Sequence, residues 1–173
     1  MGYVGSYIWK MRQKIDDDEM MSATTDVMAI RDGKVCMVFN KDCQAWCFPG
    51  GHAELGTYWQ SAARKELFEE AGITTEDEDL TPIASLSGYK IVYAEHYPVW
   101  TFSIAFICEK FEEQDFEDVE EIAEKRWFDF AEIDGLKKSL YATAIWEAYK
   151  KYVETGKFQQ VVFRGEEFKL QKD

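Results

Sequence analysis

The distribution of apolar and polar residues predicts that strands make up much of the chain. Strand-like stretches at 22–30 and 34–39 flank Asp32-Gly33, a pair typical of hairpin turns. A short strand at 45–48 leads into Pro49-Gly50-Gly51, which is expected to form a turn or loop. Later strands are expected at 83–86, 90–93, 99–108 and 126–130.

Three segments are expected to be helices, at residues 3–15, 58–71 and 136–154. The first and third have apolar residues at helical spacing, and the second contains neither Gly nor Pro. The acidic run at 16–19 is typical of a linker. The second helical segment ends at Gly72 and the third is followed by Gly156, and glycine commonly follows the last turn of a helix. The tail is expected to form a hairpin around Arg164-Gly165. Strands mixed with a few helices, without internal repeats, predict an α/β sandwich in one main domain.

The charge of the chain limits its partners. It has 33 Asp and Glu residues against 20 Lys and Arg residues, which gives a formal net charge of -13 at pH 7. Because this charge repels phosphate backbones, nucleic acid is not expected as a partner. An anionic small molecule can bind where a divalent cation held by carboxylates reverses the local field.

The cysteines and the hydropathy pattern favour a cytoplasmic protein. No secretory leader precedes the four cysteines, which are expected to be reduced: Cys36, Cys43, Cys47 and Cys108. Zinc binding by Cys43 and Cys47 is not expected, because the sequence has no second pair of cysteines at the spacing of a zinc finger. No stretch approaches the roughly 20 apolar residues that cross a bilayer, so no membrane contact is expected.

The residues with catalytic potential are concentrated in the segment 51–73. Glu66, Glu69 and Glu70 are spaced i, i+3 and i+4, so a helix places their carboxylates on one face. Like charges at this spacing destabilise a bare helix unless solvent or a cation separates them. Mg²⁺ prefers oxygen ligands, and the glycines upstream let the backbone approach the same place. A solvated charged face is the simpler alternative.

This segment resembles the signature of the Nudix hydrolase superfamily, G-x5-E-x7-R-E-U-x-E-E-x-G-U, in which U is aliphatic. The residues that match in register are Gly51, Glu66, Leu67, Glu69, Glu70, Gly72 and Ile73. Thr57 stands where the family has Glu and Lys65 where it has Arg, so both members of the family's internal ion pair are changed. Thr57 with Gln60 also matches a helix capping box. The flanks agree, since 46–51 resembles the W-x-x-P-G-G sequence of the family.

The resemblance implies a Nudix fold, an α/β/α sandwich with a mixed β-sheet. The Nudix domain is then expected at 22–156, after an N-terminal helix and acidic linker at 1–21. A C-terminal hairpin or tail follows at 157–173. The apolar face of the first helix is expected either to pack on the core or to form a homodimer contact.

The resemblance also implies a function. In the family, the carboxylates that match Glu66, Glu69 and Glu70 and the carbonyl that matches Gly51 bind divalent ions, here expected to be Mg²⁺ with Mn²⁺ as a substitute. Water attacks a phosphorus of a nucleoside diphosphate derivative, and the metal polarises the phosphoryl oxygens. Nucleotide sugars, ADP-ribose and nucleoside triphosphates all remain candidate substrates. The alternative is a Nudix-fold binding or sensor module without turnover, which the two departures favour. A prenyl diphosphate isomerase has no supporting pattern.

A second acidic segment precedes the strand at 126–130 and contains Glu120, Glu121 and Glu124. Many Nudix enzymes place a further catalytic glutamate near this point, and Glu121 is the candidate, with an acidic surface loop as the alternative. His52 and His96 are candidates for substrate contact, although exposed or locally hydrogen-bonded histidines explain both positions.

Overall fold

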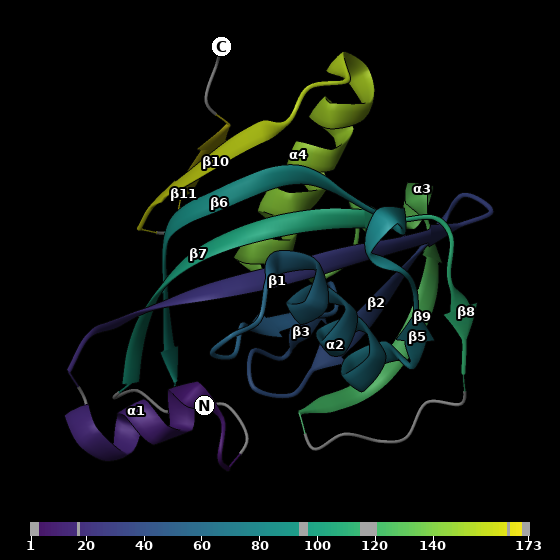
Figure 1. Cartoon of the computed structure of the whole chain (residues 1–173). Coiled ribbons are helices and arrows are strands. Elements are labelled where there is room, and N and C mark those ends of the chain that lie inside the picture. Colours follow the sequence, from purple (N-terminus) through teal and green to yellow (C-terminus); the bar gives the residue numbers. More distant parts are fainter. Residues whose placement is uncertain (1–3, 17, 94–96, 115–120, 166, 171–173) are drawn as a thin grey trace.

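A strongly curved β-sheet lies between helices α2 (Trp59–Ala71) and α4 (Leu140–Thr155), as Figure 1 shows. The computed structural model describes residues 4–16, 18–93, 97–114, 121–165 and 167–170. Successive residues of one central strand alternate between the two layers: Val27 packs under α2, and Met28 packs under α4. The three layers confirm the expected α/β/α sandwich.

The main sheet is mixed and has the order β11-β10-β6-β7-β1-β2-β3, with β4 paired to β1 and β9 paired to β2. The pairs β1–β7 and β6–β10 are parallel and the others are antiparallel. A separate small sheet joins β5 to β8. The strands are β1 (Met20–Arg31), β2 (Lys34–Asn40), β3 (Ala45–Cys47), β4 (Gly50–His52), β5 (Ile73–Thr74), β6 (Leu80–Tyr93), β7 (Tyr97–Cys108), β8 (Glu112–Glu113), β9 (Ile122–Asp129), β10 (Gln159–Arg164) and β11 (Glu167–Leu170).

The hairpin between β1 and β2 forms where the sequence predicts it. Ile30 pairs with Val35, and the two turn residues, Asp32 and Gly33, have φ values of 53° and 73°. Positive φ at both central positions is the geometry of the type I′ turn, whose twist matches that of the flanking strands. The C-terminal hairpin is also confirmed. Its strand β10 additionally pairs with β6, so the tail extends the main sheet.

The predicted loop at Pro49-Gly50-Gly51 is wrong for the two glycines, which belong to β4. Gly50 pairs with Asp26 and Gly51 with Thr25 on β1. A Cβ atom at Gly50 would collide with the carbonyl oxygen of Thr25. Gly50 is therefore required by close backbone approach within the sheet, although two consecutive glycines in a sequence usually indicate a turn.

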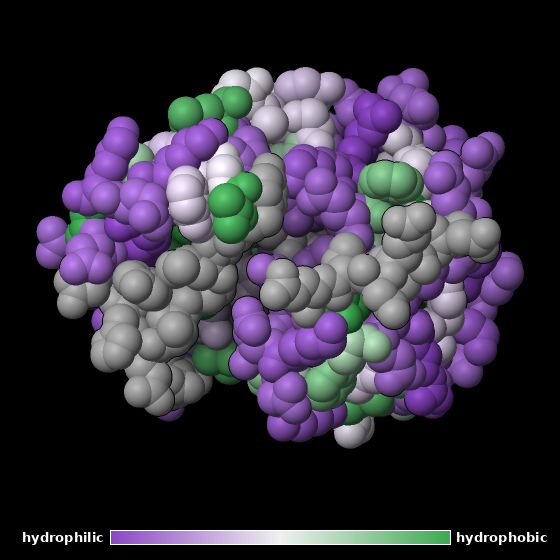
Figure 2. Space-filling model, turned by 90° about the horizontal axis from the view of Figure 1, so that it is seen from below, coloured by the Kyte–Doolittle hydropathy of each residue, from purple (hydrophilic) through white to green (hydrophobic). Residues whose placement is uncertain are grey.

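The first helix is shorter than predicted and packs within the chain. Helix α1 (Tyr7–Ile15) begins after Ser6, whose hydroxyl accepts a hydrogen bond from the Trp9 amide at 3.2 Å; residue 3 lies outside the described residues. Its buried residue Ile8 packs with Met20 and Val99. In Figure 2, the coloured hydrophobic residues lie in small separate groups among hydrophilic ones. The homodimer contact stays a prediction.

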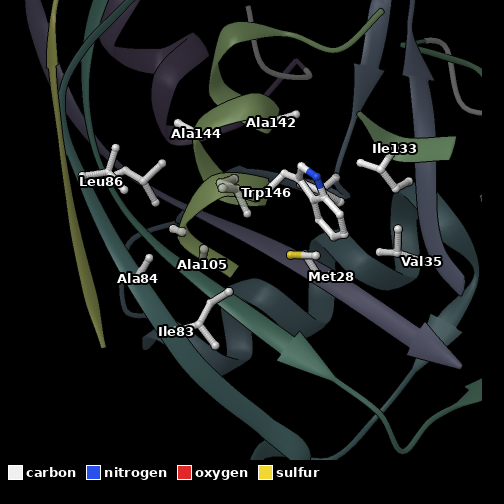
Figure 3. Close-up of a cluster of buried hydrophobic side chains, with 14 of the residues drawn as sticks. Met28, Val35, Ile83, Ala84, Leu86, Ala105, Ile133, Ala142, Ala144 and Trp146 are labelled. Carbon is white, nitrogen blue, oxygen red and sulfur yellow. The ribbon is translucent and has the colours of Figure 1, made fainter. Parts of the chain in front are cut away.

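Helix α4 begins at Leu140, four residues later than predicted, because the Ser139 hydroxyl caps it by accepting from the Ala142 amide at 3.0 Å. Gly156 ends it in the left-handed conformation, as expected. Figure 3 shows Trp146 of this helix lying against side chains of the sheet. The cluster around it contains buried apolar residues from both layers: Met28, Val35, Ile83, Ala84, Leu86, Ala105, Ile133 and Ala144.

Two further boundaries differ from prediction. The strands expected at 83–86 and 90–93 are one continuous strand, β6, which passes through a bulge at Gly88 with φ 77°. The strand expected to end at 130 stops at Asp129, where the short helix α3 (Phe130–Ile133) begins. A 3-10 turn, η1 (Asp77–Asp79), precedes β6. No helix within the described residues is long and apolar enough to span a membrane.

Candidate active site

Helix α2 places two of its glutamates against the glycines of β4. The Gly50 amide donates a hydrogen bond to Oε2 of Glu70 at 2.9 Å. A Cβ atom built on Gly51 would lie 2.5 Å from Oε2 of Glu66, so this carboxylate lies directly against the glycine backbone. The segment before the helix and the helix itself therefore meet at one place, as expected from the sequence. Only glycine leaves the room that this contact needs.

A third carboxylate, Asp26, belongs to the same cluster and is missed by the sequence analysis. It lies on β1 opposite Gly50, and its Oδ2 accepts a hydrogen bond from the Ser103 hydroxyl at 3.0 Å. The negative charge of Glu66 contributes to raising the pKa of Asp26. One signal was available in the sequence: Asp26 interrupts an otherwise apolar and hydroxyl-bearing strand, where an acid needs a specific partner.

The three carboxylates hold protons more tightly than ordinary acids. Burial raises the pKa of Glu66 to about 7 and that of Asp26 to about 7. Burial also raises the pKa of Glu70 well above its usual range, and the charges of Glu66, Glu121 and Asp26 add to this effect although the Gly50 amide opposes it. Buried carboxylates that repel one another favour either bound protons or a bound cation.

Glu69 lies on the outer side of the cluster. Its Oε2 accepts a hydrogen bond from Nζ of Lys65 at 2.7 Å, and about half of its side chain is exposed. Lys65 also lies 3.5 Å from Oε1 of Glu66, so one ammonium group contacts two of the three helix glutamates. The charge of Glu69 nevertheless raises the pKa of Glu66, which places it within electrostatic reach.

Glu121 approaches the cluster from another part of the chain. It is exposed and immediately precedes β9, where its carbonyl accepts a hydrogen bond from the Lys41 amide at 2.9 Å. Its charge raises the pKa of both Glu66 and Glu70. Glu124 is exposed on β9, and Glu120 lies outside the described residues. The fold therefore brings Glu121 near the helix glutamates from more than 50 positions away in the sequence.

The chemistry of this donor set fits a hard divalent cation, because carboxylate and carbonyl oxygens are the ligands that Mg²⁺ and Mn²⁺ prefer. The candidate ligands are Glu66, Glu70, Glu69 and the carbonyl of Gly51. Within the residues that the structure describes, no three His, Cys, Asp or Glu side chains are already arranged as a finished metal site.

A family model described as the NUDIX domain matches residues 20–152 of this chain. The chain belongs to the Nudix family. This confirms the resemblance inferred from the segment 51–73, and it identifies the chain as a member of the Nudix hydrolases. No curated protein matches the chain.

Solved Nudix structures share the fold at low sequence identity. A mutator MutT protein from Bacillus halodurans is 17% identical with a TM-score of 0.63, over 87% of this chain and 97% of that one. An ADP compounds hydrolase is 16% identical with a TM-score of 0.60, over 78% and 74%. A bifunctional NMN adenylyltransferase/ADP ribose pyrophosphatase from Francisella tularensis, complexed with AMP and a Mn ion, is 18% identical with a TM-score of 0.58, over 85% and 45%.

The two departures from the Nudix signature have partners of their own. The Thr57 hydroxyl donates to the Glu54 carbonyl at 2.6 Å, and Lys65 contacts glutamates of α2. The expected capping box at Thr57 is wrong, because the helix starts one residue later. There the Ser61 hydroxyl accepts a hydrogen bond from the Tyr58 amide at 3.1 Å. Tyrosine is an unusual N-cap residue, which is why the sequence pattern pointed to Thr57.

The remaining candidates are placed as follows. His52 lies on β4 with Nδ1 2.8 Å from the Ser22 hydroxyl, and burial lowers its pKa to about 4, so it is neutral at pH 7. His96 lies outside the described residues. All four cysteines are free thiols; Cys36 and Cys108 are buried, whereas Cys43 precedes β3 and is in contact with Cys47 at the end of that strand.

Proposed function

We propose that this Nudix protein is a Mg²⁺-dependent pyrophosphohydrolase that cleaves the diphosphate linkage of a nucleoside diphosphate derivative. The observation that carries the proposal is the cluster of Glu66, Glu70 and Asp26 against the glycine backbone of β4. Burial of mutually repelling carboxylates destabilises a fold that has no cation to bind, so the arrangement has a functional explanation.

The cation would be held by Glu66, Glu69, Glu70 and the carbonyl of Gly51, with Mn²⁺ able to replace Mg²⁺. When bound, it would polarise the phosphoryl oxygens and lower the pKa of the attacking water. Because neither Gly50 nor Gly51 carries a side chain, the backbone of β4 can lie directly against the carboxylates of Asp26 and Glu66.

Glu121 is the proposed proton acceptor for the attacking water. Glu121 is exposed, unlike Glu66 and Glu70, and its negative charge raises the pKa of both. An exposed carboxylate at the edge of a metal cluster can accept a proton and release it to solvent, as general-base catalysis requires.

The substrate class is a nucleotide derivative such as a nucleotide sugar, ADP-ribose or a nucleoside triphosphate. Two structural neighbours support this choice, an ADP compounds hydrolase and an ADP ribose pyrophosphatase. The net charge of -13 makes a local cation a requirement for binding such anions.

A nucleotide-binding or sensor module without turnover is the second candidate. The ion pair between Lys65 and Glu69 favours it, because the ammonium neutralises one of the three helix carboxylates in place of a metal. Lysine at this position also contacts Glu66. Turnover would then depend on displacing Lys65 from both glutamates.

The deciding experiment is a screen of nucleoside diphosphate derivatives with Mg²⁺ or Mn²⁺, in which phosphate release is read with and without added phosphatase. An enzyme gives release that depends on the cation and is lost in Glu70→Gln but retained in Glu78→Gln, a control on the exposed turn η1. No release for any compound, together with nucleotide-induced increases in melting temperature, would support the sensor instead.

A further inference from the structure

Two free cysteines lie in contact at the turn between β2 and β3. Sγ of Cys43 is 3.6 Å from Sγ of Cys47, and the two sulfurs lie 4.0 and 3.9 Å from the Ala45 carbonyl oxygen. Cys43 is exposed and Cys47 is partly buried, whereas Cys36 and Cys108 are buried elsewhere. The pair therefore combines one thiol that solvent can reach with one that is protected.

The turn holds the two thiols together in the reduced protein. Oδ1 of Asn40 accepts hydrogen bonds from the amides of Asp42 and Cys43, at 2.9 and 3.1 Å. The Gln44 side-chain amide donates to the Lys41 carbonyl at 2.8 Å, and Gln44 itself has a φ of 51°. A turn fixed in this way reduces the rearrangement that a bond between the two sulfurs needs.

The surroundings give the two thiols different roles. A hydrogen bond from the Cys47 thiol holds the pKa of Cys43 below its usual range, whereas that hydrogen bond and burial raise the pKa of Cys47. Cys47 also lies 3.5 Å from the Ser139 hydroxyl. Because thiolates are the reactive form, Cys43 is the attacking sulfur and Cys47 the one that closes the bond.

We propose that Cys43 and Cys47 form a reversible disulfide that is made by reaction with a hydroperoxide. The Cys43 thiolate attacks one peroxide oxygen, the O–O bond breaks, and the products are a Cys43 sulfenic acid and, after protonation, water or an alcohol. The Cys47 sulfur then attacks the Cys43 sulfur, the S–O bond breaks, and the hydroxide leaves with the Cys47 thiol proton as water. Sulfur is oxidised and peroxide reduced, and an external dithiol restores both thiols by exchange.

The position of the pair connects it to the candidate active site. Cys47 ends β3, and three residues later the Gly50 amide contacts Glu70. On its other side, the Ser139 hydroxyl beside Cys47 caps α4. A disulfide between Cys43 and Cys47 would therefore constrain the backbone at a point that lies between the carboxylate cluster and the start of α4.

The test is peptide mapping of the whole protein, and it needs neither substrate nor metal. Trypsin releases residues 42–64 as one peptide that contains Cys43 and Cys47 and no other cysteine. In protein treated with hydrogen peroxide and then alkylated after unfolding, this peptide is expected to lose both alkyl groups and to be lighter than the reduced peptide by two hydrogen atoms. Dithiothreitol should restore double alkylation.

Variants and buried cysteines supply the controls. The peptides that carry Cys36 and Cys108 should remain alkylated throughout. Cys47→Ser should accumulate a sulfenic acid on Cys43 that dimedone traps, and Cys43→Ser should show no trapping at Cys47. Double alkylation of peptide 42–64 after peroxide, addition of oxygen without loss of hydrogen, or a disulfide between chains would each overturn the proposal. The wild-type mapping decides the matter even if a variant fails to fold.

Discussion

The two helices that cover the sheet bury opposite chemistry against it. Under α4 the contacts are apolar, with Trp146 and its neighbours from both layers. Under α2 the apolar stripe of Ala63 and Leu67 lies beside Glu66 and Glu70, whose carboxylates contact β4. Burial of apolar surface stabilises the fold, whereas burial of like charges opposes it. The comparison indicates that the α4 side provides stability and that the α2 side loses stability to the carboxylate cluster that we propose as a cation site.

The largest expected effect tests the α4 side. Trp146→Ala should lower the free energy of unfolding by about 3–5 kcal/mol, because it leaves a cavity beside Phe130 and removes the indole hydrogen bond to Asp134. Urea denaturation measures the change. A loss below about 1 kcal/mol would show that the α4 side is not the main source of stability. Any rise in melting temperature on adding Mg²⁺ should persist, since the cluster under α2 is untouched.

Glu70→Gln is the corresponding change on the α2 side. It keeps the shape and leaves an oxygen for the Gly50 amide, but it removes one charge from the cluster. Turnover should fall by a factor of roughly 100 or more, about 2.7 kcal/mol, while the metal-free protein loses no stability. Steady-state rates and urea unfolding of the metal-free protein measure the two effects. Activity within about twofold of wild type would contradict the assignment of Glu70 to the metal site.

The pH dependence of the free energy of unfolding tests whether burial of Glu66 on the α2 side costs stability. Its pKa of about 7 in the folded protein exceeds the ordinary value of 4.5, so the folded state binds more protons between these values. Rising pH therefore reduces the stability of the metal-free wild type across this range. Glu66→Gln does not titrate. It should match the wild type near pH 4.5 and exceed it above pH 7 by on the order of 1–3 kcal/mol.

Thermal or urea unfolding of both proteins, without divalent cations, tests this expectation. Titration of His52, whose pKa is lowered, contributes equally to both proteins and cancels in the difference. A constant difference between the two proteins from pH 4.5 to pH 8 would contradict the assignment of a raised pKa to Glu66. Saturating Mg²⁺ should remove the advantage of the variant at high pH, because the cation stabilises the charged carboxylates.

The smallest effect concerns the ion pair on the outer side of α2. Lys65→Met should change stability by less than about 1 kcal/mol, because the pair with Glu69 is partly exposed. Removal of the ammonium should tighten Mg²⁺ binding by a few-fold, about 1 kcal/mol, since Glu69 and Glu66 lose a competing cation. Lys151→Met, which breaks an exposed pair with Glu154 on α4, is the matched control and should leave Mg²⁺ affinity unchanged. Weaker binding in Lys65→Met alone would mean that Lys65 assists the cluster.

Local signals in the sequence predicted the helices and the two hairpins well. Gly72 and Gly156 mark helix ends because each adopts the left-handed conformation there, and Asp32-Gly33 marks a turn for the same reason. Errors occurred where long-range contacts decide the structure. Gly50 and Gly51 were assigned to a loop because the contacts that require glycine are made with distant residues, with Thr25 of β1 for Gly50 and with Glu66 of α2 for Gly51.

The candidate site was predicted in part for the same reason. Glu66 and Glu70 were found because a helix fixes the relation between nearby residues, and the resemblance supplied Glu121. Asp26 was missed because its place in the cluster depends on the pairing of β1 with β4. The outward position of Glu69 was also unforeseen, since only the side-chain contacts show that Lys65 holds it.

The parallel pairing of β10 with β6 has a consequence for any shortened form of this chain. The C-terminal hairpin covers β6 from Ala84 to Ser87, and the Phe163 carbonyl lies so near Gly88 that an added Cβ would be 2.8 Å away. Truncation at 156 would leave β6 as an edge strand with unpaired amide and carbonyl groups. Because such edges recruit strands from other molecules, a chain shortened in this way is expected to aggregate through β6, a strand that the hairpin covers in the full chain.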